Sequence, residues 1–220
     1  MKCFFCGSPM SISFENHRYV ESGLRNVVLA DVEVRRCPGC GEEELVLSAF
    51  HRVRERVPQA RLLVAPRHPE RFGEVPALVE AAGFRCLRRS ALDPAAWRDG
   101  EVLLLDTLGE LAQVYALASV VFVGGSLVPS GGHNILEPAV AGKAVVVGPH
   151  MENFQEIADQ FRSESAMVQV ASPDELAREV SALLLDEERR RGLGERARDL
   201  VGRNRGAVRR TTDALASLLA

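Results

Sequence analysis

Three short runs of consecutive apolar residues constrain the fold of this chain more than any other feature. Leu62–Val64, Val102–Leu105 and Val145–Val147 contain no alternating polar positions. A strand of this kind must be buried on both faces, as it is in a parallel sheet covered by helices on both sides. Stretches with helical spacing of apolar residues separate the runs. The sequence therefore predicts an α/β fold with a doubly wound parallel sheet.

The expected elements alternate between strand and helix from Glu43 onward. Strands are predicted at 61–65, 84–87, 102–105, 120–123 and 144–147. Helices are predicted at 43–57, 69–82 and 108–118, from about residue 134, at 151–161 and 173–185, and from 187 onward. This order is typical of repeated βαβ units.

Residues 1–44 follow a different pattern and are predicted to form a small β module, with the α/β domain covering 45–220. Ile12 and Phe14 alternate with polar neighbours, and Val28, Ala30, Val32 and Val34 alternate again, so the two segments predict a β-hairpin. About 44 residues bury too little apolar surface to fold without help, so a bound metal would supply much of the stability.

Four cysteines form two Cys-x-x-Cys pairs, each followed by a glycine. They are Cys3, Cys6, Cys37 and Cys40. Four thiolates make a closed tetrahedral site for a structural zinc ion. A redox role is disfavoured because neither pair opens a helix after a strand. His17 is either a substitute ligand or a surface residue, and Cys86, in an apolar run, is predicted to be a buried small hydrophobic residue.

Composition excludes several functional classes. The chain has 220 residues and a net charge of −3, so bulk charge does not indicate nucleic-acid binding. No apolar stretch approaches the roughly 18 residues that a membrane span needs. No secretory signal is visible, and a cytoplasmic location is expected.

Two polar stretches follow predicted strands and carry the candidate chemistry. One is Pro66-Arg67-His68, and the other runs from Gly124-Gly125-Ser126 through Gly131-Gly132-His133-Asn134 to Glu137. Because ligands of open α/β sheets bind at the carboxyl ends of the strands, the two stretches are expected to converge.

The residue types in these stretches suit a nucleotide. Glycines let the backbone approach a ligand, and a helix starting near Asn134 would offer N–H groups to a phosphate. Arg67 could bind the same phosphate, and Glu137 could accept hydrogen bonds from ribose hydroxyls. Taken singly, Arg67 and His68 could be a solvated edge, and Glu137 could be a charge favoured by the helix dipole.

The residues of several sequence motifs resemble those of a known family. The segments are Pro-Arg-His-Pro-Glu-Arg-Phe at 66–72, Asp-Thr-x-Gly-Glu-Leu at 106–111, Gly-Gly-Ser at 124–126, Gly-Gly-His-Asn-x-Leu-Glu-Pro at 131–138, Gly-Pro-His at 148–150 and Asn-Arg-Gly-Ala at 204–207. From about residue 42 to 220 the chain resembles the C-terminal domain of 3-deoxy-D-manno-octulosonic acid (Kdo) transferases, which are GT-B glycosyltransferases with Rossmann-like domains. Residues 1–44 resemble the YgiT-type zinc finger of certain antitoxins.

The resemblance implies a CMP-Kdo donor and transfer to a lipid A precursor in lipopolysaccharide synthesis, without a metal for the transfer. It implies that Arg67 holds the CMP phosphate, that the loops at Gly109 and at 124–126 lie against the nucleotide, and that Asn134 and Glu137 bind its ribose and phosphate region. The predicted substrate-binding residues are Arg67, His68, Gly109, Gly125, Ser126, Gly132, Asn134 and Glu137. Such an enzyme would be cytoplasmic or peripheral at the inner membrane.

The chain also departs from that family. The family's N-terminal domain, which binds the acceptor and supplies the general base, has no counterpart here, so no catalytic residue is assigned and donor binding without transfer is expected. The boundary between the segment that resembles a zinc finger and the segment that resembles a transferase lies at Gly41-Glu42-Glu43. We hypothesise that a gene fusion, or an artefact of sequence assembly, joined the two. Two alternatives remain: an antitoxin-like zinc-finger module that captures a protein partner beside a nucleotide-sensing domain, and a GT-B enzyme that uses a UDP-sugar.

Overall fold

The computed structural model describes residues 27–32, 41–91 and 97–204, and its strands form one seven-stranded sheet. The sheet order is β3-β4-β2-β1-β5-β6-β7, and every neighbouring pair is parallel. The strands are β1 (Val27–Val32), β2 (Arg61–Pro66), β3 (Cys86–Arg88), β4 (Val102–Leu104), β5 (Val120–Val123), β6 (Ala144–Val147) and β7 (Val168–Gln169). The predicted parallel α/β fold is confirmed.

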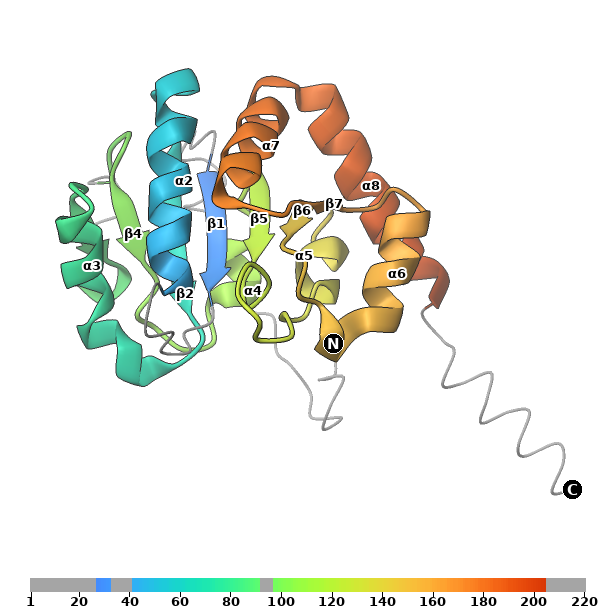
Figure 1. The fold of residues 1–220 in the computed structure, drawn as a ribbon, viewed down its shortest axis with the longest axis horizontal. Helices are drawn as coiled ribbons and strands as arrows, with labels where there is room; N and C mark the ends of the chain where they lie inside the picture. Colours follow the sequence, from blue (N-terminus) through green and yellow to red (C-terminus); the bar gives the residue numbers. More distant parts are fainter. Residues whose placement is uncertain (1–26, 33–40, 92–96, 205–220) are drawn as a thin grey trace, which may run out of the picture.

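Helices cover both faces of the sheet (Figure 1). The α-helices are α2 (Glu42–Arg56), α3 (Val75–Ala81), α4 (Leu111–Val114), α5 (Leu136–Val140), α6 (Gln155–Ser163), α7 (Pro173–Leu185) and α8 (Glu187–Asn204). The 3-10 turns are η1 (Pro69–Gly73), η2 (Arg89–Ala91) and η4 (Glu152–Phe154). The apolar residues of α2, α3 and α7 pack on one face, and those of α4, α5 and α6 pack on the other.

Alternation along each strand divides the core in two. In β2, Leu62 and Val64 belong to the cluster under α2 and α7, whereas Leu63 and Ala65 belong to the opposite cluster. Both sets are buried, so the strand has no polar face. This is the physical reason that the apolar runs in the sequence predict strands correctly.

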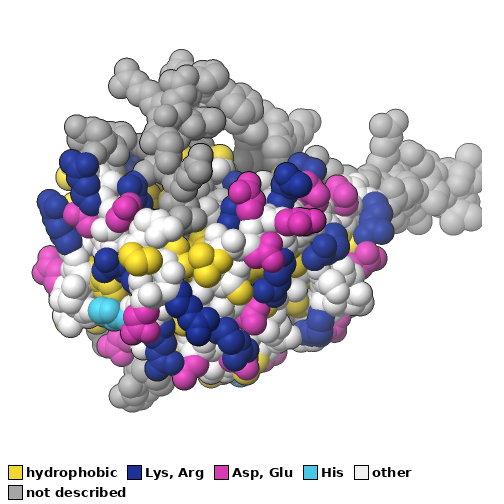
Figure 2. Space-filling model, turned by 90° about the horizontal axis from the view of Figure 1, so that it is seen from above, with side chains coloured by type: hydrophobic (Ala, Val, Ile, Leu, Met, Phe, Trp, Pro, Cys, Tyr) yellow, Lys and Arg dark blue, Asp and Glu magenta, His cyan; other side chains and the backbone are white. Residues whose placement is uncertain are grey.

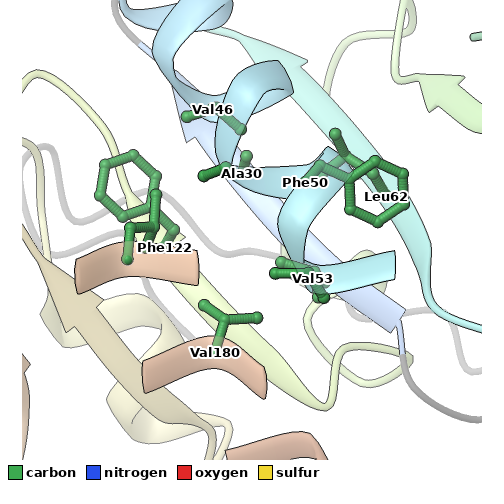
Figure 3. Close-up of a pocket in the computed structure, with 10 residues that line it drawn as sticks. Ala30, Val46, Phe50, Val53, Leu62, Phe122 and Val180 are labelled. Atoms are coloured by element: carbon green, nitrogen blue, oxygen red, sulfur yellow. The ribbon is translucent and has the colours of Figure 1, made fainter. Parts of the chain in front are cut away.

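Helix α2 packs across the middle of the sheet. Its first turn carries three glutamates and its last turn carries Arg54 and Arg56, so both ends suit the helix dipole. The ring of Phe50 lies beside Leu62 of β2, and Val53 belongs to the same core cluster (Figure 3). They border an apolar void of ≈ 20 Å³ between α2, α7 and the sheet.

Strand β1 corrects the prediction of an antiparallel hairpin at residues 28–34. It lies in the middle of the sheet, where Val28 is in register with Leu62 of β2 on one side and with Val120 of β5 on the other. Val27 and Val28 are both buried, on opposite faces. The sheet therefore includes a strand from the residues assigned to the zinc module. Cys3, Cys6, Cys37, Cys40 and His17 lie outside the described residues.

Two predicted helices are shorter than expected. The segment 69–82 divides into η1 and α3, because Pro76 lacks an N–H and fits only the first turn of a helix. The segment 108–118 keeps only α4, after Gly109 adopts a φ of +82°. Cys86 is half-buried rather than fully buried, and burial raises the pKa of its thiol to about 11.

Charges of both signs are interspersed on the face of the molecule seen from above in Figure 1, as Figure 2 shows. The tops of α2 and α7 lie on that side, which is where the strands begin. The carboxyl ends of the strands lie at the opposite edge.

The packing of α2 predicts a large stability loss for Phe50→Ala. Phe50 is buried and its ring centroid lies 5.2 Å from that of Phe84. Truncation beside an existing void should lower the free energy of unfolding by about 3–5 kcal/mol. Leu185→Ala, at a side chain that is 66% exposed, is the control and should change it by less than about 0.5 kcal/mol. Urea denaturation of both variants measures the difference, and equal losses would contradict this packing.

Candidate functional site

The segments that follow β2, β4 and β5 meet around one open hollow at the carboxyl edge of the sheet. Its volume is ≈ 230 Å³. It is lined by Ala65, Pro66, Arg67, Phe72, Leu105, Thr107, Leu108, Gly109, Leu111, Tyr115, His133, Asn134 and Glu137. Parallel strands bring these segments together although they are distant in the sequence.

Arg67 supplies a positive charge to the hollow. It directly follows β2, its side chain is exposed, and it makes no ion pair with any other described residue. His68 does not line the hollow, and its Nδ1 lies 3.5 Å from Oε1 of Glu70. Of these two neighbouring residues, only Arg67 lines the hollow.

The loop after β4 forms the second wall, and side-chain bonds hold it in place. Asp106 accepts hydrogen bonds from the backbone N–H and the hydroxyl of Ser90, at 2.8 and 2.7 Å. Thr107 donates to Glu110 at 3.0 Å. Between them, Leu108 is 77% exposed and Gly109 has a positive φ. The loop thus presents an apolar side chain and bare backbone to the hollow.

Asn134 and Glu137 form the third wall and contact each other. Asn134 Nδ2 donates to Glu137 Oε1 at 3.3 Å, while Asn134 Oδ1 accepts from the backbone N–H of Leu136 at 3.0 Å. The predicted proximity of the two side chains is confirmed. Helix α5 begins at Leu136, close to the expected start near Asn134, but it has only five residues.

The glycine loop after β5 holds a carboxylate of the protein itself. Glu42, at the start of α2, is buried and accepts backbone hydrogen bonds from Gly125 at 2.6 Å, Ser126 at 3.1 Å and Leu127 at 2.9 Å. Burial raises the pKa of the Glu42 carboxyl, while these bonds and the nearby His133 oppose the shift. The backbone N–H groups of these three loop residues are therefore bonded to a side chain of the protein itself.

The glycine loop after β5 also interlocks with the loop after β6. The backbone N–H of Gly132 donates to the carbonyl of Gly125 at 2.8 Å. Ser126 is buried, and its hydroxyl accepts from the N–H of Gly148 at 2.8 Å. A side chain at Gly132 would lie 2.5 Å from Sδ of Met151. Gly125, Ser126 and Gly132 are not among the residues that line the hollow, and they support its wall from behind. Their predicted contact with the ligand stays a prediction.

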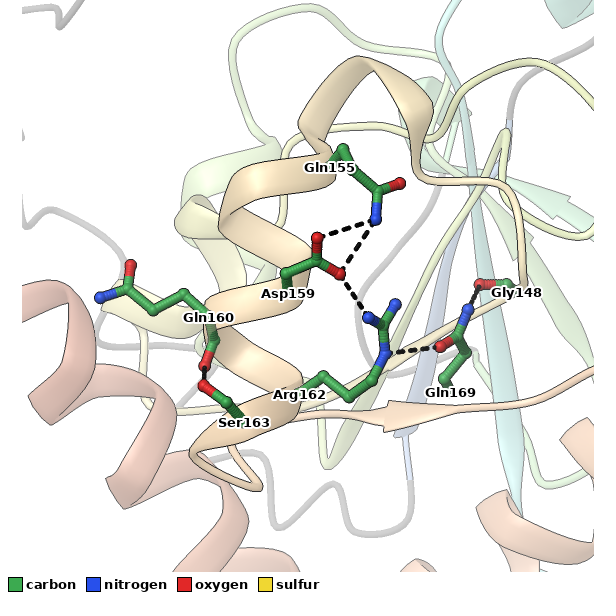
Figure 4. Close-up of polar contacts among 7 residues, drawn as sticks. All are labelled: Gly148, Gln155, Asp159, Gln160, Arg162, Ser163 and Gln169. Atoms are coloured by element: carbon green, nitrogen blue, oxygen red, sulfur yellow. Dashed lines mark hydrogen bonds and ion pairs between the residues drawn. The ribbon is translucent and has the colours of Figure 1, made fainter.

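Helix α6 anchors the loop after β6 through a chain of polar side chains (Figure 4). Gln169 donates to the carbonyl of Gly148 at 3.3 Å and accepts from Arg162 at 3.0 Å. Arg162 also pairs with Asp159, which accepts from Gln155 at 2.9 Å. The network fixes the loop against which Ser126 packs.

Of the predicted substrate-binding residues, the hollow brings together Arg67, Gly109, Asn134 and Glu137. Several further residues that line the hollow were not predicted to bind the substrate, namely Phe72, Thr107, Leu108, Leu111, Tyr115 and His133. Thr107 and Leu108 lie shortly after the end of β4, a position that could have identified them, whereas the other residues lie further along their segments. Glu42 was missed as well, and no local pattern indicates its contact with a loop 83 residues away.

Comparison with known proteins identifies the family. Residues 43–200 match the family described as Glycosyl transferases group 1. The chain belongs to this family. Its sheet and flanking helices form a Rossmann-like domain of the GT-B type. The antitoxin-like alternative finds no support in the comparisons.

Two relatives in the family are 3-deoxy-D-manno-octulosonic acid transferases. The enzyme of Haemophilus influenzae is 39% identical over 176 residues, which are 80% of this chain and 41% of that enzyme. The enzyme of Bordetella pertussis is 38% identical over 178 residues, which are 80% of this chain and 42% of that enzyme. The chain thus spans less than half the length of these relatives.

Among solved structures, the chain is similar to the C-terminal CMP-Kdo binding domain of WaaA from Acinetobacter baumannii. The identity is 34%, the TM-score is 0.73, and the match covers 84% of this chain and 93% of that domain. The Anabaena protein HepE, solved with UDP, matches with 15% identity and a TM-score of 0.63 over 91% of this chain and 51% of that protein, which shows the fold alone.

In the part of the chain that the structure describes, no helix has both the length and the apolar character needed to cross a membrane.

The loop after β4 predicts a conformational cost for Gly109→Ala. The position is open to solvent, but its φ of +82° is unfavourable for any residue with a Cβ. We expect the free energy of unfolding to fall by about 1–2 kcal/mol. Gly73→Ala, also in open space but without a positive φ, is the matched control and should be neutral. Thermal unfolding measures both, and an unchanged Gly109→Ala variant would refute this loop conformation.

Proposed function

We propose that the hollow binds the CMP part of CMP-Kdo and that the chain is the donor-binding part of a Kdo transferase. The observation that carries this proposal is that Arg67, which follows β2, lines one hollow with Asn134 and Glu137, which come from the segment after β5. The 34% identity to a CMP-Kdo binding domain supports the choice of nucleotide.

The charges of the hollow suit a nucleotide monophosphate. Arg67 can donate two parallel hydrogen bonds to the phosphate. Glu137 can accept from ribose hydroxyls, and the second N–H of the Asn134 amide can donate to an oxygen of the same ribose or phosphate. The exposed Leu108 and the bare backbone at Gly109 offer an apolar surface to the base.

In the proposed reaction the bond between the sugar carbon and the phosphate oxygen breaks, and the electron pair remains on the departing CMP. Arg67 would offset the negative charge that develops on that phosphate, a contribution that is largest in the transition state. The acceptor is a hydroxyl of a lipid A precursor, and its proton must go to a general base. No described residue of the hollow is assigned that role, so we propose that the acceptor side and its base come from outside residues 27–204. We propose that the transfer needs no metal and takes place at the cytoplasmic surface of the inner membrane.

Nucleotide binding tests this proposal. Calorimetry should detect CMP binding, with an affinity reduced at least about tenfold in Arg67→Ala and in Glu137→Ala, because each loses hydrogen bonds to a charged group. Arg191→Ala and Glu195→Ala remove an exposed ion pair of 3.7 Å on α8 and should bind CMP like the wild type. Equal losses of CMP affinity in both pairs of variants would count against CMP binding in the hollow.

A panel of nucleotides separates the donor classes in the same assay. CMP should bind more tightly than UDP or GDP, and preference for UDP would favour the alternative of a UDP-sugar transferase. Incubation of this chain alone with CMP-Kdo and a lipid A precursor should yield no product. Turnover would refute the proposal that the acceptor side and its base come from outside residues 27–204.

We further propose that Cys3, Cys6, Cys37 and Cys40 hold one structural zinc ion and that the surface around it can engage a protein partner. Four thiolates are the donor set of closed structural zinc sites. The two cysteine pairs flank strand β1 in the sequence, so a shared ion would tie the segments on both sides of that strand. Elemental analysis should find about one zinc per chain, lost in Cys37→Ser. A zinc-free, folded wild-type chain would exclude the site.

A further inference from the structure

Glu42 connects the start of α2 to the glycine loop after β5. Its Oε2 accepts from the N–H of Gly125, and its Oε1 accepts from the N–H groups of Ser126 and Leu127. The residue is 1% exposed and does not line the hollow. A buried carboxylate with several backbone donors is held in one geometry, because each lost bond leaves a buried polar group unsatisfied.

A backbone hydrogen bond connects the glycine loop held by Glu42 to the wall of the hollow. The carbonyl of Gly125 accepts from the N–H of Gly132 at 2.8 Å. Gly132 directly precedes His133 and Asn134, which line the hollow. Gly132 also packs against Met151, so it cannot shift toward the loop after β6. A displacement of Gly125 would therefore move the wall that contains Asn134.

We infer that Glu42 is a positioning residue for nucleotide binding, which acts through Gly125 and Gly132 on Asn134 and does not touch the ligand. The inference rests on the proposed function of the hollow. It assigns a role to a carboxylate that the proposed reaction does not otherwise use.

The neighbouring Glu43 shows that burial alone does not create this role. Glu43 is 2% exposed, and burial raises its pKa as it does for Glu42. Its side chain pairs with Arg71 at 3.3 Å instead of with the glycine loop. Two consecutive buried glutamates at the same helix end thus differ in the segment they hold. Glu43→Gln is the matched control for Glu42→Gln.

The test compares the full-length chain with Glu42→Gln and Glu43→Gln. A glutamine has the length of glutamate but turns one acceptor into a donor, so it cannot accept from Gly125 and from Leu127 together. We expect Glu42→Gln to bind CMP about tenfold more weakly than Glu43→Gln. In ligand-free Glu42→Gln, the NMR amide signals of Gly132 and Asn134 should shift, and in Glu43→Gln they should stay at the wild-type positions.

The outcomes distinguish this inference from the proposed function. A folded Glu42→Gln that binds CMP like the wild type, with unmoved signals at Gly132 and Asn134, would overturn the positioning role. If the wild type does not bind CMP, the proposed function fails, and the ligand-free amide signals still decide whether Glu42 positions this wall. If Glu42→Gln does not fold, Glu42→Asp, which retains the charge on a shorter side chain, replaces it and should show the same signal shifts with a smaller loss of affinity.

Discussion

The rest of the site depends on the hydrogen bonds that the Glu42 carboxylate accepts from the glycine loop after β5. Burying an ionised carboxylate is unfavourable unless hydrogen bonds replace its water, and here three backbone N–H groups of one loop do so. The same bonds fix that loop against α2, the helix that packs across the sheet. Sheet packing and site geometry are therefore linked through a single side chain.

At the carboxyl edge of the sheet, some residues support the hollow and others line it. The glycine loops carry bonds among themselves, with Glu42 and with the segment after β6, which α6 anchors in turn. The hollow itself is built from side chains that follow β2, β4 and β5. An arrangement of rigid supports behind a few exposed polar groups, such as Arg67 and Glu137, suits a site that orients a charged ligand.

The sequence predicted β2, β4, β5 and β6 well because these strands are buried on both faces. It did not predict the short edge strand β7, whose two residues are not buried. It failed at β1, since alternating residues look alike in a hairpin and in a central parallel strand, and only burial on both sides separates the two. Arg67, Gly109, Asn134 and Glu137 were predictable from their place after strand ends. Gly125 and Gly132 do not line the hollow, and the sequence alone could not show this because a glycine needed for close packing looks like one needed for a ligand. The role of Glu42 depends on a contact between distant segments, which no local pattern contains.

The proposed function requires that one nucleotide binds in the hollow between the three strand-end segments. Titration of the chain with CMP, followed by amide chemical shifts, tests it most directly. The account predicts saturable shifts concentrated at residues 66–72, 107–111 and 133–137, with none around residues 57–60 at the opposite edge of the sheet. Shifts confined to any other surface, or no shifts at millimolar CMP, would contradict it.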